Sequence, residues 1–204
     1  MQSDRDLLRA WRAGDRQAGS ALFDRYFDGV RRFFRNKVDH GVEDLVQATF
    51  VACVESRDRF REEASFRTFL FAIAHNILKE HYRRRQRSDR ELDLDRDSIV
   101  DLGASPTSLL VAQAEEKLLL HGLRTLPIAS QVILELYYWE GLTGAELGAL
   151  LGVPEDTARS RLRKARGQLE LAIARLEASR SELDSTLSGL DRWAARLRDQ
   201  LAPR

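Results

Sequence analysis

Apolar residues recur at intervals of three and four along most of this 204-residue chain, and this spacing constrains the fold more than any other feature. The pattern is clearest in residues 15–35. Its apolar members there are Leu22, Phe23, Tyr26, Phe27, Val30, Phe33 and Phe34. Such intervals place side chains on one face of an α-helix, whereas strands need an alternation for which the chain offers little Val and Ile. We therefore expect an all-α fold.

The same spacing predicts four helices in the first half of the chain, which could share one core. Ser3 can cap the first helix and Gly14 can end it; the others are expected over 15–35, 42–59 and 65–87. Periodicity is lost over residues 88–108 and resumes at 109–123, and Pro127 can open a further helix that Gly141 closes. We expect two small helical domains and a flexible linker between them.

Charges are segregated along the chain although the formal net charge is only +1. Lys79–Arg90 holds six basic residues, and Thr157–Arg166 holds five with no acidic residue. The linker is acidic: Glu91, Asp93, Asp95, Asp97 and Asp101 stand against Arg96 alone. Two basic surfaces flanking an acidic connector favour a polyanionic partner such as nucleic acid.

Several classes of protein are disfavoured. No apolar run reaches the roughly 18 residues of a membrane span, and the N-terminus lacks the apolar core of a signal peptide, so we expect a cytoplasmic protein without membrane insertion. The single cysteine, Cys53, lies in an apolar run and cannot form an internal disulfide. The histidines are scattered and no phosphate-binding loop occurs, so we expect no catalytic residue, no metal and no cofactor.

Residues 142–166 follow the pattern of a helix-turn-helix. Thr143 and Glu146 can form a capping box, Gly152 suits the tight turn, and Pro154 can start the second helix. If Ala158 and Leu162 face the core, the polar side chains that turn outward toward base edges and phosphates are Thr157, Arg159, Ser160, Arg163 and Lys164. The alternative is a basic, solvated face on an ordinary bundle helix, which leaves the cap, the turn and the spacing unexplained.

The helix expected over 65–87 combines rings with a basic end. The rings are Phe66, Phe69, Phe71 and Tyr82. Rings beside cations suit unstacked bases. The alternative, core phenylalanines and a solvated helix end that complements the helix dipole, stays open at this point.

Three motifs occur in order: Glu43-Asp-Leu-Val-Gln-Ala-Thr-Phe50, Phe66-Arg-Thr-Phe-Leu-Phe-Ala-Ile-Ala-His-Asn76 and the helix-turn-helix. With them the chain resembles a bacterial RNA polymerase sigma factor of the extracytoplasmic-function class over residues 4–174. The resemblance implies a region 2 domain at 1–87, a linker at 88–108 and a region 4 domain at 109–175. It departs from the family at Phe69, commonly Trp, and at Glu62, commonly a small residue.

The resemblance also implies site residues and partners. Those that match the helix docking on the clamp helices of the largest polymerase subunit are Asp44, Leu45, Gln47 and Phe50. Phe60, Arg61 and Ser65 match the loop that captures an extruded minus-ten base; Asn76 and Lys79 match neighbouring DNA contacts, to which the charge run adds Arg83 and Arg84. The outward residues of the second helix of the helix-turn-helix match minus-thirty-five readers. Region 4 is also expected on the flap of the second-largest subunit, and an anti-sigma factor is a further candidate partner.

Residues 176–204 lie beyond the family pattern, yet leucines keep intervals of three and four there. This extension is expected to be helical and either to pack on the second domain, to bind a partner or to self-associate. For the whole chain, the sequence favours a sigma factor that joins core polymerase and reads minus-ten and minus-thirty-five elements. The alternative is a stand-alone helix-turn-helix regulator with an N-terminal sensing domain, and an enzyme is the least favoured.

Overall fold

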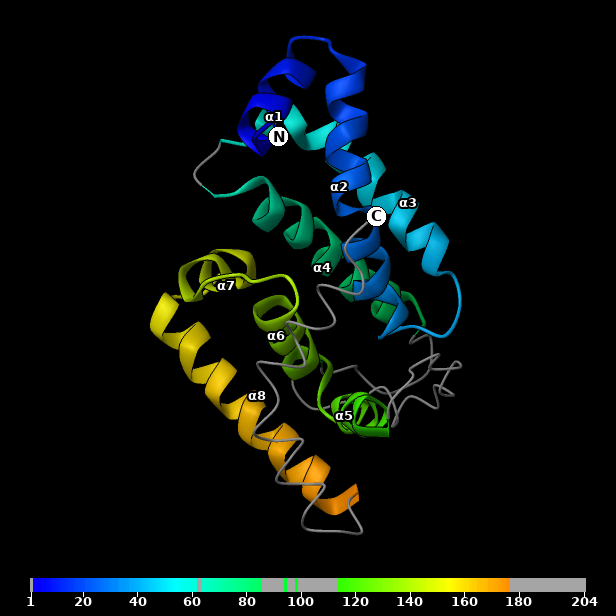
Figure 1. Ribbon diagram of the computed structural model, residues 1–204, viewed down its shortest axis with the longest axis vertical. Helices are drawn as coiled ribbons and strands as arrows, with labels where there is room; N and C mark the ends of the chain where they lie inside the picture. The colour runs from blue at the N-terminus through cyan, green and yellow to red at the C-terminus, as the bar shows by residue number, and fades with distance from the viewer. Residues whose placement is uncertain (1, 62–63, 86–93, 95–97, 99–113, 177–204) are drawn as a thin grey trace.

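The computed structural model of the protein describes residues 2–61, 64–85, 94, 98 and 114–176 (Figure 1). Every regular element in these ranges is helical, which confirms the all-α prediction. Ser98 forms an isolated bridge with Pro127, and Leu94 accepts a hydrogen bond from the Ala129 amide. Apart from those two residues, the acidic linker and the extension from residue 177 onward lie outside the described residues.

The first half of the chain folds into four α-helices and a short 3-10 helix. They are α1 (Asp4–Arg12), α2 (Arg16–Arg35), α3 (Val42–Ser56), η1 (Arg57–Arg59) and α4 (Phe66–Arg85). The predicted Ser3 cap is present, since Ser3 accepts from the Asp6 amide, and Asp15, which was not singled out as a cap, accepts from the amides of Gln17 and Ala18. Each of these caps satisfies backbone donors that the first helical turn leaves without a partner.

The core of this half combines residues of the predicted periodic face of α2 with residues of α4. Leu22 and Phe34 of α2, and Leu70 and Phe71 of α4, are fully buried. One interpretation was wrong: Phe27, placed on the buried face of the second helix, is 46% exposed because it lies at the edge of that face and stacks on Phe50 instead.

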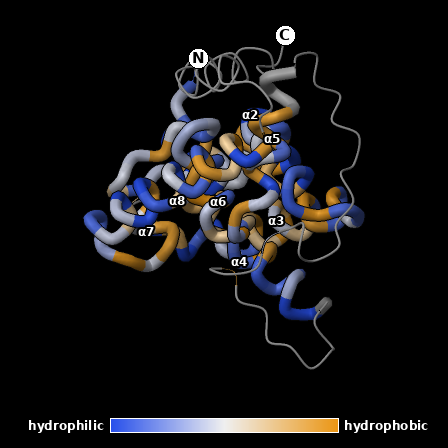
Figure 2. The backbone as a smooth tube through the Cα atoms, turned by 90° about the horizontal axis from the view of Figure 1, so that it is seen from below, coloured by the Kyte–Doolittle hydropathy of each residue, from blue (hydrophilic) through white to orange (hydrophobic). Residues whose placement is uncertain are grey.

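The second half consists of α5 (Ala114–Arg124), α6 (Ile128–Tyr138), α7 (Gly144–Leu151) and α8 (Glu155–Leu176). Helix α6 is the most buried of them; Ile128, Val132 and Leu136 have no exposed surface. Helices α5, α7 and α8 pack around it, as Figure 1 shows. Figure 2 shows hydrophilic and apolar residues alternating in short stretches along these helices, as amphipathic helices around a shared core require.

The two halves lie against each other. Helix α4 of the first half packs against α7 of the second, and buried residues of both halves belong to one continuous hydrophobic cluster. Helix α3 lies on the side of the first half that faces away from α7 and α8 (Figure 1). The fold therefore defines three surfaces that are candidate binding sites: the outer face of α3, the junction of α4 with α7, and the outer face of α8.

Candidate nucleic-acid interface

Helices α7 and α8 form the predicted helix-turn-helix. Thr143 and Glu146 make a reciprocal capping box: the Thr143 hydroxyl accepts from the Glu146 amide at 3.2 Å, and a Glu146 carboxylate oxygen accepts from the Thr143 amide at 2.9 Å. Gly152 ends α7 in the left-handed region at φ 68°, where glycine carries no steric penalty. The prediction of cap, turn and second helix is confirmed.

The close crossing of α7 and α8 depends on a second glycine that sequence reasoning did not single out. A Cβ added at Gly148 would lie 2.8 Å from the carbonyl oxygen of Val153, a backbone atom that cannot give way easily. The Val153 amide in turn donates to the Gly148 carbonyl at 3.0 Å. The backbone of the turn is thus fastened directly to α7.

The outer face of α8 carries the residues expected to reach DNA. Ala158 is fully buried and Leu162 is half-buried. The residues predicted to turn outward, and exposed in the structure, are Thr157, Arg159, Ser160, Arg163 and Lys164. Helix α8 therefore presents a basic, polar face of the kind that enters a major groove.

Arg159 is held in place within this face. Its guanidinium donates to the Glu155 carboxylate from Nε at 2.8 Å and from Nη2 at 2.5 Å, and these hydrogen bonds raise the pKa of Arg159. A Cβ on Gly144 would lie 3.0 Å from Nε of Arg159 and 3.1 Å from the Glu155 carboxylate. A side chain at Gly144 would crowd this ion pair, which lies across the start of α7.

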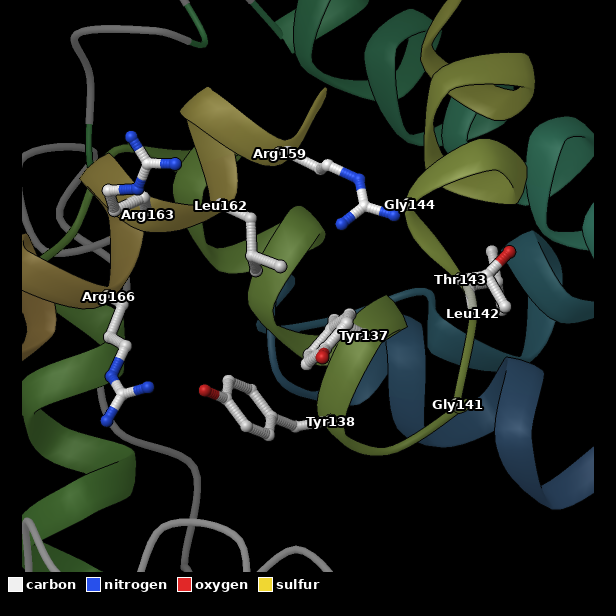
Figure 3. Close-up of a pocket in the computed structure, with 10 residues that line it drawn as sticks. All are labelled: Tyr137, Tyr138, Gly141, Leu142, Thr143, Gly144, Arg159, Leu162, Arg163 and Arg166. Carbon is white, nitrogen blue, oxygen red and sulfur yellow. The ribbon is translucent and has the colours of Figure 1, made fainter. Parts of the chain in front are cut away.

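A groove of about 710 Å³ lies beside the recognition face, between the end of α6 and α8. Figure 3 shows Arg159 extending toward Gly144, while Arg166 extends toward Tyr138. The groove is lined by three arginines and two tyrosines: Arg159, Arg163, Arg166, Tyr137 and Tyr138. Tyr137, a residue of α6, is 39% exposed.

The loop before α4 forms a second candidate contact. The rings of Phe60 and Phe69 stack with centroids 4.4 Å apart, and Arg12 donates to the carbonyls of Arg57 and Phe60. Arg59, Arg61 and Phe69 line a pocket of about 320 Å³ beside this stack. The structure thus brings Phe60 and Arg61 together with Phe69; Glu62, the departure from the family pattern, lies outside the described residues.

A stripe of polar side chains on helix α4 leads away from this pocket. Ala72 lines the pocket, and Asn76, Lys79 and Arg83 follow at helical intervals on the same face, each exposed. Arg83 and Arg84 both pair with Glu80, at 2.5 Å and 2.8 Å.

The rings of α4 divide between core and surface. Phe66, Phe71 and Tyr82 are buried, which answers the open question from the sequence: they are core residues. Only Phe69, which is half-buried, remains available beside the pocket.

The outer face of α3 carries a different stripe. Asp44, Gln47, Val51 and Val54 recur at helical intervals and are exposed, the two valines at 48% and 40%. Leu45 and Phe50 are half-buried and pack on the core, and Phe50 stacks with Phe27 at a centroid distance of 6.2 Å. Sequence reasoning missed Val51 and Val54, because apolar residues in a helix are expected to face its core.

Contacts between the halves were not predicted either. Glu146 of α7 accepts hydrogen bonds from the hydroxyls of Ser65, at 2.8 Å, and Thr68, at 3.1 Å, and its carboxylate lies 3.7 Å from Arg67. Burial alone would raise the pKa of Glu146, but the hydrogen bonds from Thr143, Ser65 and Thr68 lower it to about 2. The carboxylate is therefore ionised at neutral pH.

Two ion pairs also join the halves. Lys37, next to the end of α2, pairs with Glu135 of α6, and both side chains are buried. Arg32 of α2 pairs with Glu140 at 2.7 Å, with 19% and 11% of the two side chains exposed. These two ion pairs are hard to predict from the sequence, since each of the four residues alone is compatible with a solvated helix face.

The chain matches two known protein families. Residues 22–88 match Sigma-70 region 2, and residues 116–169 match Sigma-70, region 4. It is 27% identical over 177 residues to the ECF RNA polymerase sigma-E factor of Escherichia coli, covering 82% of this chain and 93% of that protein. The protein of the same name from Haemophilus influenzae is 26% identical over 177 residues, covering 82% of this chain and 94% of that protein.

Two solved structures are similar in fold. The structure of CnrH in complex with the cytosolic domain of CnrY has a TM-score of 0.62 and 23% identity, covering 85% of this chain and 98% of that chain. The structure of the sigma factor RpoE in complex with the anti-sigma factor NepR from Bartonella quintana has a TM-score of 0.60 and 20% identity. It covers 76% of this chain and 96% of that chain. Among the helices that the structure describes, none is both long and apolar enough to cross a membrane.

Proposed function

Because the chain belongs to the extracytoplasmic-function class of RNA polymerase sigma factors, it directs promoter-specific initiation of transcription with core RNA polymerase, and we propose which residues make each contact. This membership sets aside the alternative of a stand-alone regulator with a sensing domain. We divide the chain functionally as the sequence suggested: region 2 at 1–87, a linker at 88–108, region 4 at 109–175 and an extension at 176–204. Since core polymerase and promoter DNA are its partners, its place of action is the cytoplasm.

The pocket beside Phe60 is proposed to take an unpaired base of the minus-ten element. The single observation that carries this proposal is the stacked pair Phe60–Phe69 beside Arg59 and Arg61, which offers ring surface and positive charge in one place. Stacking on an aromatic ring contributes about 1–3 kcal/mol per base, whatever the base. Ser65, Asn76, Lys79, Arg83 and Arg84 then follow the strand along α4.

The exposed face of α8 is proposed to read the minus-thirty-five element. Arg159 and Arg163 are suited to base edges and phosphates, and Thr157, Ser160 and Lys164 lie on the same face. The arginine and tyrosine groove next to this face supports contacts with the sugar-phosphate backbone.

The outer face of α3 is proposed to dock on the clamp helices of the largest polymerase subunit. Asp44 and Gln47 supply polar contacts, and Leu45 and Phe50 hold the helix on the core so that the stripe keeps its shape. Val51 and Val54, exposed beside them, extend this surface with the apolar area that protein interfaces bury. Region 4 is proposed to contact the flap of the second-largest subunit.

Run-off transcription from genomic fragments with core polymerase tests the proposal as a whole. The protein should start transcripts only in the presence of core polymerase and only at a subset of fragments. If the purified protein neither binds core polymerase nor starts transcripts, the assignment fails.

Three substitutions separate the contacts. Asp44→Ala should weaken binding to core polymerase, with Asp24→Ala, an exposed carboxylate of α2, as its control. Phe60→Ala should slow promoter opening while closed-complex formation is retained. Arg159→Ala should weaken binding to duplex upstream DNA, with Arg175→Ala at the end of α8 as its control. Equal loss in every assay for one variant would show that its residue is structural.

A further inference from the structure

The end of α1 contacts the loop that carries Phe60. Nε and Nη2 of Arg12 donate to the carbonyl oxygen of Arg57 at 3.1 Å and 2.6 Å, and Nη2 also donates to the carbonyl oxygen of Phe60. The same guanidinium lies 5.9 Å from the centroid of the Phe60 ring. One side chain of α1 thus holds the loop at two backbone positions and contacts the ring that is proposed to stack on a base.

The segment from Arg57 to Phe60 needs such a partner, because it is only a short 3-10 turn. The hydrogen bond from the Phe60 amide to the Arg57 carbonyl is long, at 3.4 Å. Carbonyl groups at the end of a helical turn have no acceptor role within the turn and need donors from elsewhere. A guanidinium suits them, since its donors form a rigid planar fork that can bridge two acceptors. Arg12 therefore supplies a restraint that the turn lacks.

Arg12 is presented to the loop from a well-packed helix end. The preceding residue, Trp11, is 7% exposed, and its ring packs edge-on against Phe23 with centroids 5.2 Å apart. A Cβ added at Gly19 would lie 2.6 Å from the Trp11 ring, so α2 lies directly against this ring. The guanidinium of Arg57 lies 5.1 Å from the centroid of the same ring, within the range of a cation–π contact. Trp11 thus anchors the end of α1 on α2 and also contacts the loop segment.

Arg12 holds the loop without lying in the pocket proposed for the base. That pocket is lined by Phe60, Arg61 and Phe69 among other residues, and Arg12 is not one of them. Helix α1 also precedes residues 22–88, over which the chain matches Sigma-70 region 2. A contribution of Arg12 to strand binding therefore has to act through the loop.

We propose that Arg12 is a positioning residue for the captured minus-ten base: it holds the Phe60 loop in the shape that receives the base, without touching DNA. This inference rests on the proposed role of the Phe60 loop. The rings of Phe60 and Phe69 stack with an interplanar angle of 21°. A loop that has to become ordered during binding binds less tightly. Because Arg12 orders the loop beforehand, it raises the affinity for the base.

The test measures how much the captured base contributes to binding, with and without Arg12. Each full-length variant is assembled with core polymerase, and fluorescence anisotropy gives its affinity for a labelled single-stranded oligonucleotide. The oligonucleotide carries the non-template minus-ten region of a promoter mapped by run-off transcription. An abasic nucleotide placed at each position in turn identifies where the wild type loses most affinity. The ratio of intact to abasic affinity at that position isolates the captured base, because a general loss of folded protein or of polymerase binding cancels in it.

Three variants are compared with the wild type. Arg12→Gln removes the charged fork, and Arg12→Lys keeps the charge but cannot bridge two carbonyls in the same way. Arg9→Gln is the matched control, since Arg9 is exposed one turn earlier on α1. Thermal melting confirms that each variant is folded, and Arg12→Lys serves alone if Arg12→Gln does not fold.

The wild type and Arg9→Gln should show a ratio of about tenfold, which corresponds to the stacking of one base. Arg12→Gln should lower the ratio to about threefold or less, because part of the stacking free energy is then spent on ordering the loop. Arg12→Lys should fall between the two. An unchanged ratio in a folded Arg12 variant, or an equal decrease in Arg9→Gln, overturns the inference.

Failure of the proposed function gives a different result. In that case no abasic position weakens binding of the wild type, and Phe60→Ala binds the intact oligonucleotide as tightly as the wild type does. That outcome removes the role of the Phe60 loop and the inference with it. A wild type that is sensitive at one position, beside an Arg12→Gln that is equally sensitive there, rejects the role of Arg12 alone.

Discussion

Nζ of Lys37 lies 2.5 Å from Oε2 of Glu135, and neither side chain reaches solvent, although the two residues belong to different halves of the chain. Lys37 also donates to the Phe33 carbonyl at 2.9 Å and lies 4.1 Å from the centroid of the Phe33 ring. Burial lowers the pKa of Lys37 and raises the pKa of Glu135, while each partner opposes the shift of the other. Each of these two buried charges is therefore stabilised by the other.

A double-mutant cycle tests this interdependence. Glu135→Leu alone should lower the free energy of unfolding by about 3 kcal/mol, because it leaves the Lys37 ammonium buried without a partner. Adding Lys37→Met should recover at least half of that loss, since both groups are then apolar. Urea denaturation of the three variants and the wild type measures the coupling. Strictly additive losses would contradict the finding that the two groups depend on each other.

The stability of the protein should depend on pH through His75. Burial, followed by the nearby charges of Lys79 and Lys37, lowers the pKa of this histidine from 6.5 to about 4. Because the unfolded chain binds the proton first, the contribution is fully present above pH 6.5 and is lost as the pH falls from 6.5 toward 4. The shift corresponds to about 3 kcal/mol over that interval.

Urea denaturation at several pH values measures this dependence. His75→Leu should flatten the slope of stability between pH 6.5 and pH 4, the interval set by the pKa of His75. His40→Gln, at an exposed position, should keep the wild-type slope. A wild-type slope in His75→Leu would show that other groups carry the dependence.

Two glycines in region 4 should respond in opposite directions to alanine. At Gly148 the new Cβ would meet the Val153 carbonyl oxygen at 2.8 Å, so Gly148→Ala should cost about 1–3 kcal/mol and weaken binding of upstream duplex DNA. At Gly167, inside α8, the new Cβ would meet no atom within 4 Å other than its chain neighbours and the backbone of its own helix, so Gly167→Ala should stabilise the helix by about 0.5–1 kcal/mol. Thermal denaturation measures the change in stability of each variant, and a duplex-binding assay measures the change in affinity for upstream DNA. A change in stability of the same sign in both variants would refute the packing argument.

The capping box of α7 should be measurable by one substitution. Thr143→Ala removes the oxygen that accepts from the Glu146 amide and should cost about 1 kcal/mol. Thr143→Ser keeps that oxygen and should retain most of the stability. Chemical denaturation distinguishes the two variants, and an equal loss for both would attribute the effect to the lost methyl group.

Much of the fold could be predicted from the sequence, because local chemistry decides it. The Ser3 cap, the Thr143–Glu146 box and the turn at Gly152 each depend on residues within a few positions of one another. The outward face of α8 followed from the same logic, since burying Ala158 determines which side chains remain outside. The DNA and polymerase contacts assigned to these residues stay predictions.

The parts that could not be predicted depend on distant residues. Glu146 was recognised as a cap, but its second set of contacts, with Ser65 and Thr68, exists only because α7 packs against α4. Lys37 and Glu135 each look like ordinary charged residues until the fold buries them together. Val51 and Val54 were missed because apolar residues of a helix are expected to face the core, whereas these two are exposed.

The position of α3, on the side of the first half that faces away from α7 and α8, separates the surface proposed for the polymerase from the surface proposed for upstream DNA. A partner as bulky as a polymerase subunit can then cover α3 without lying over the outer face of α8. Docking on the enzyme and reading the duplex need not compete for the same side of the molecule.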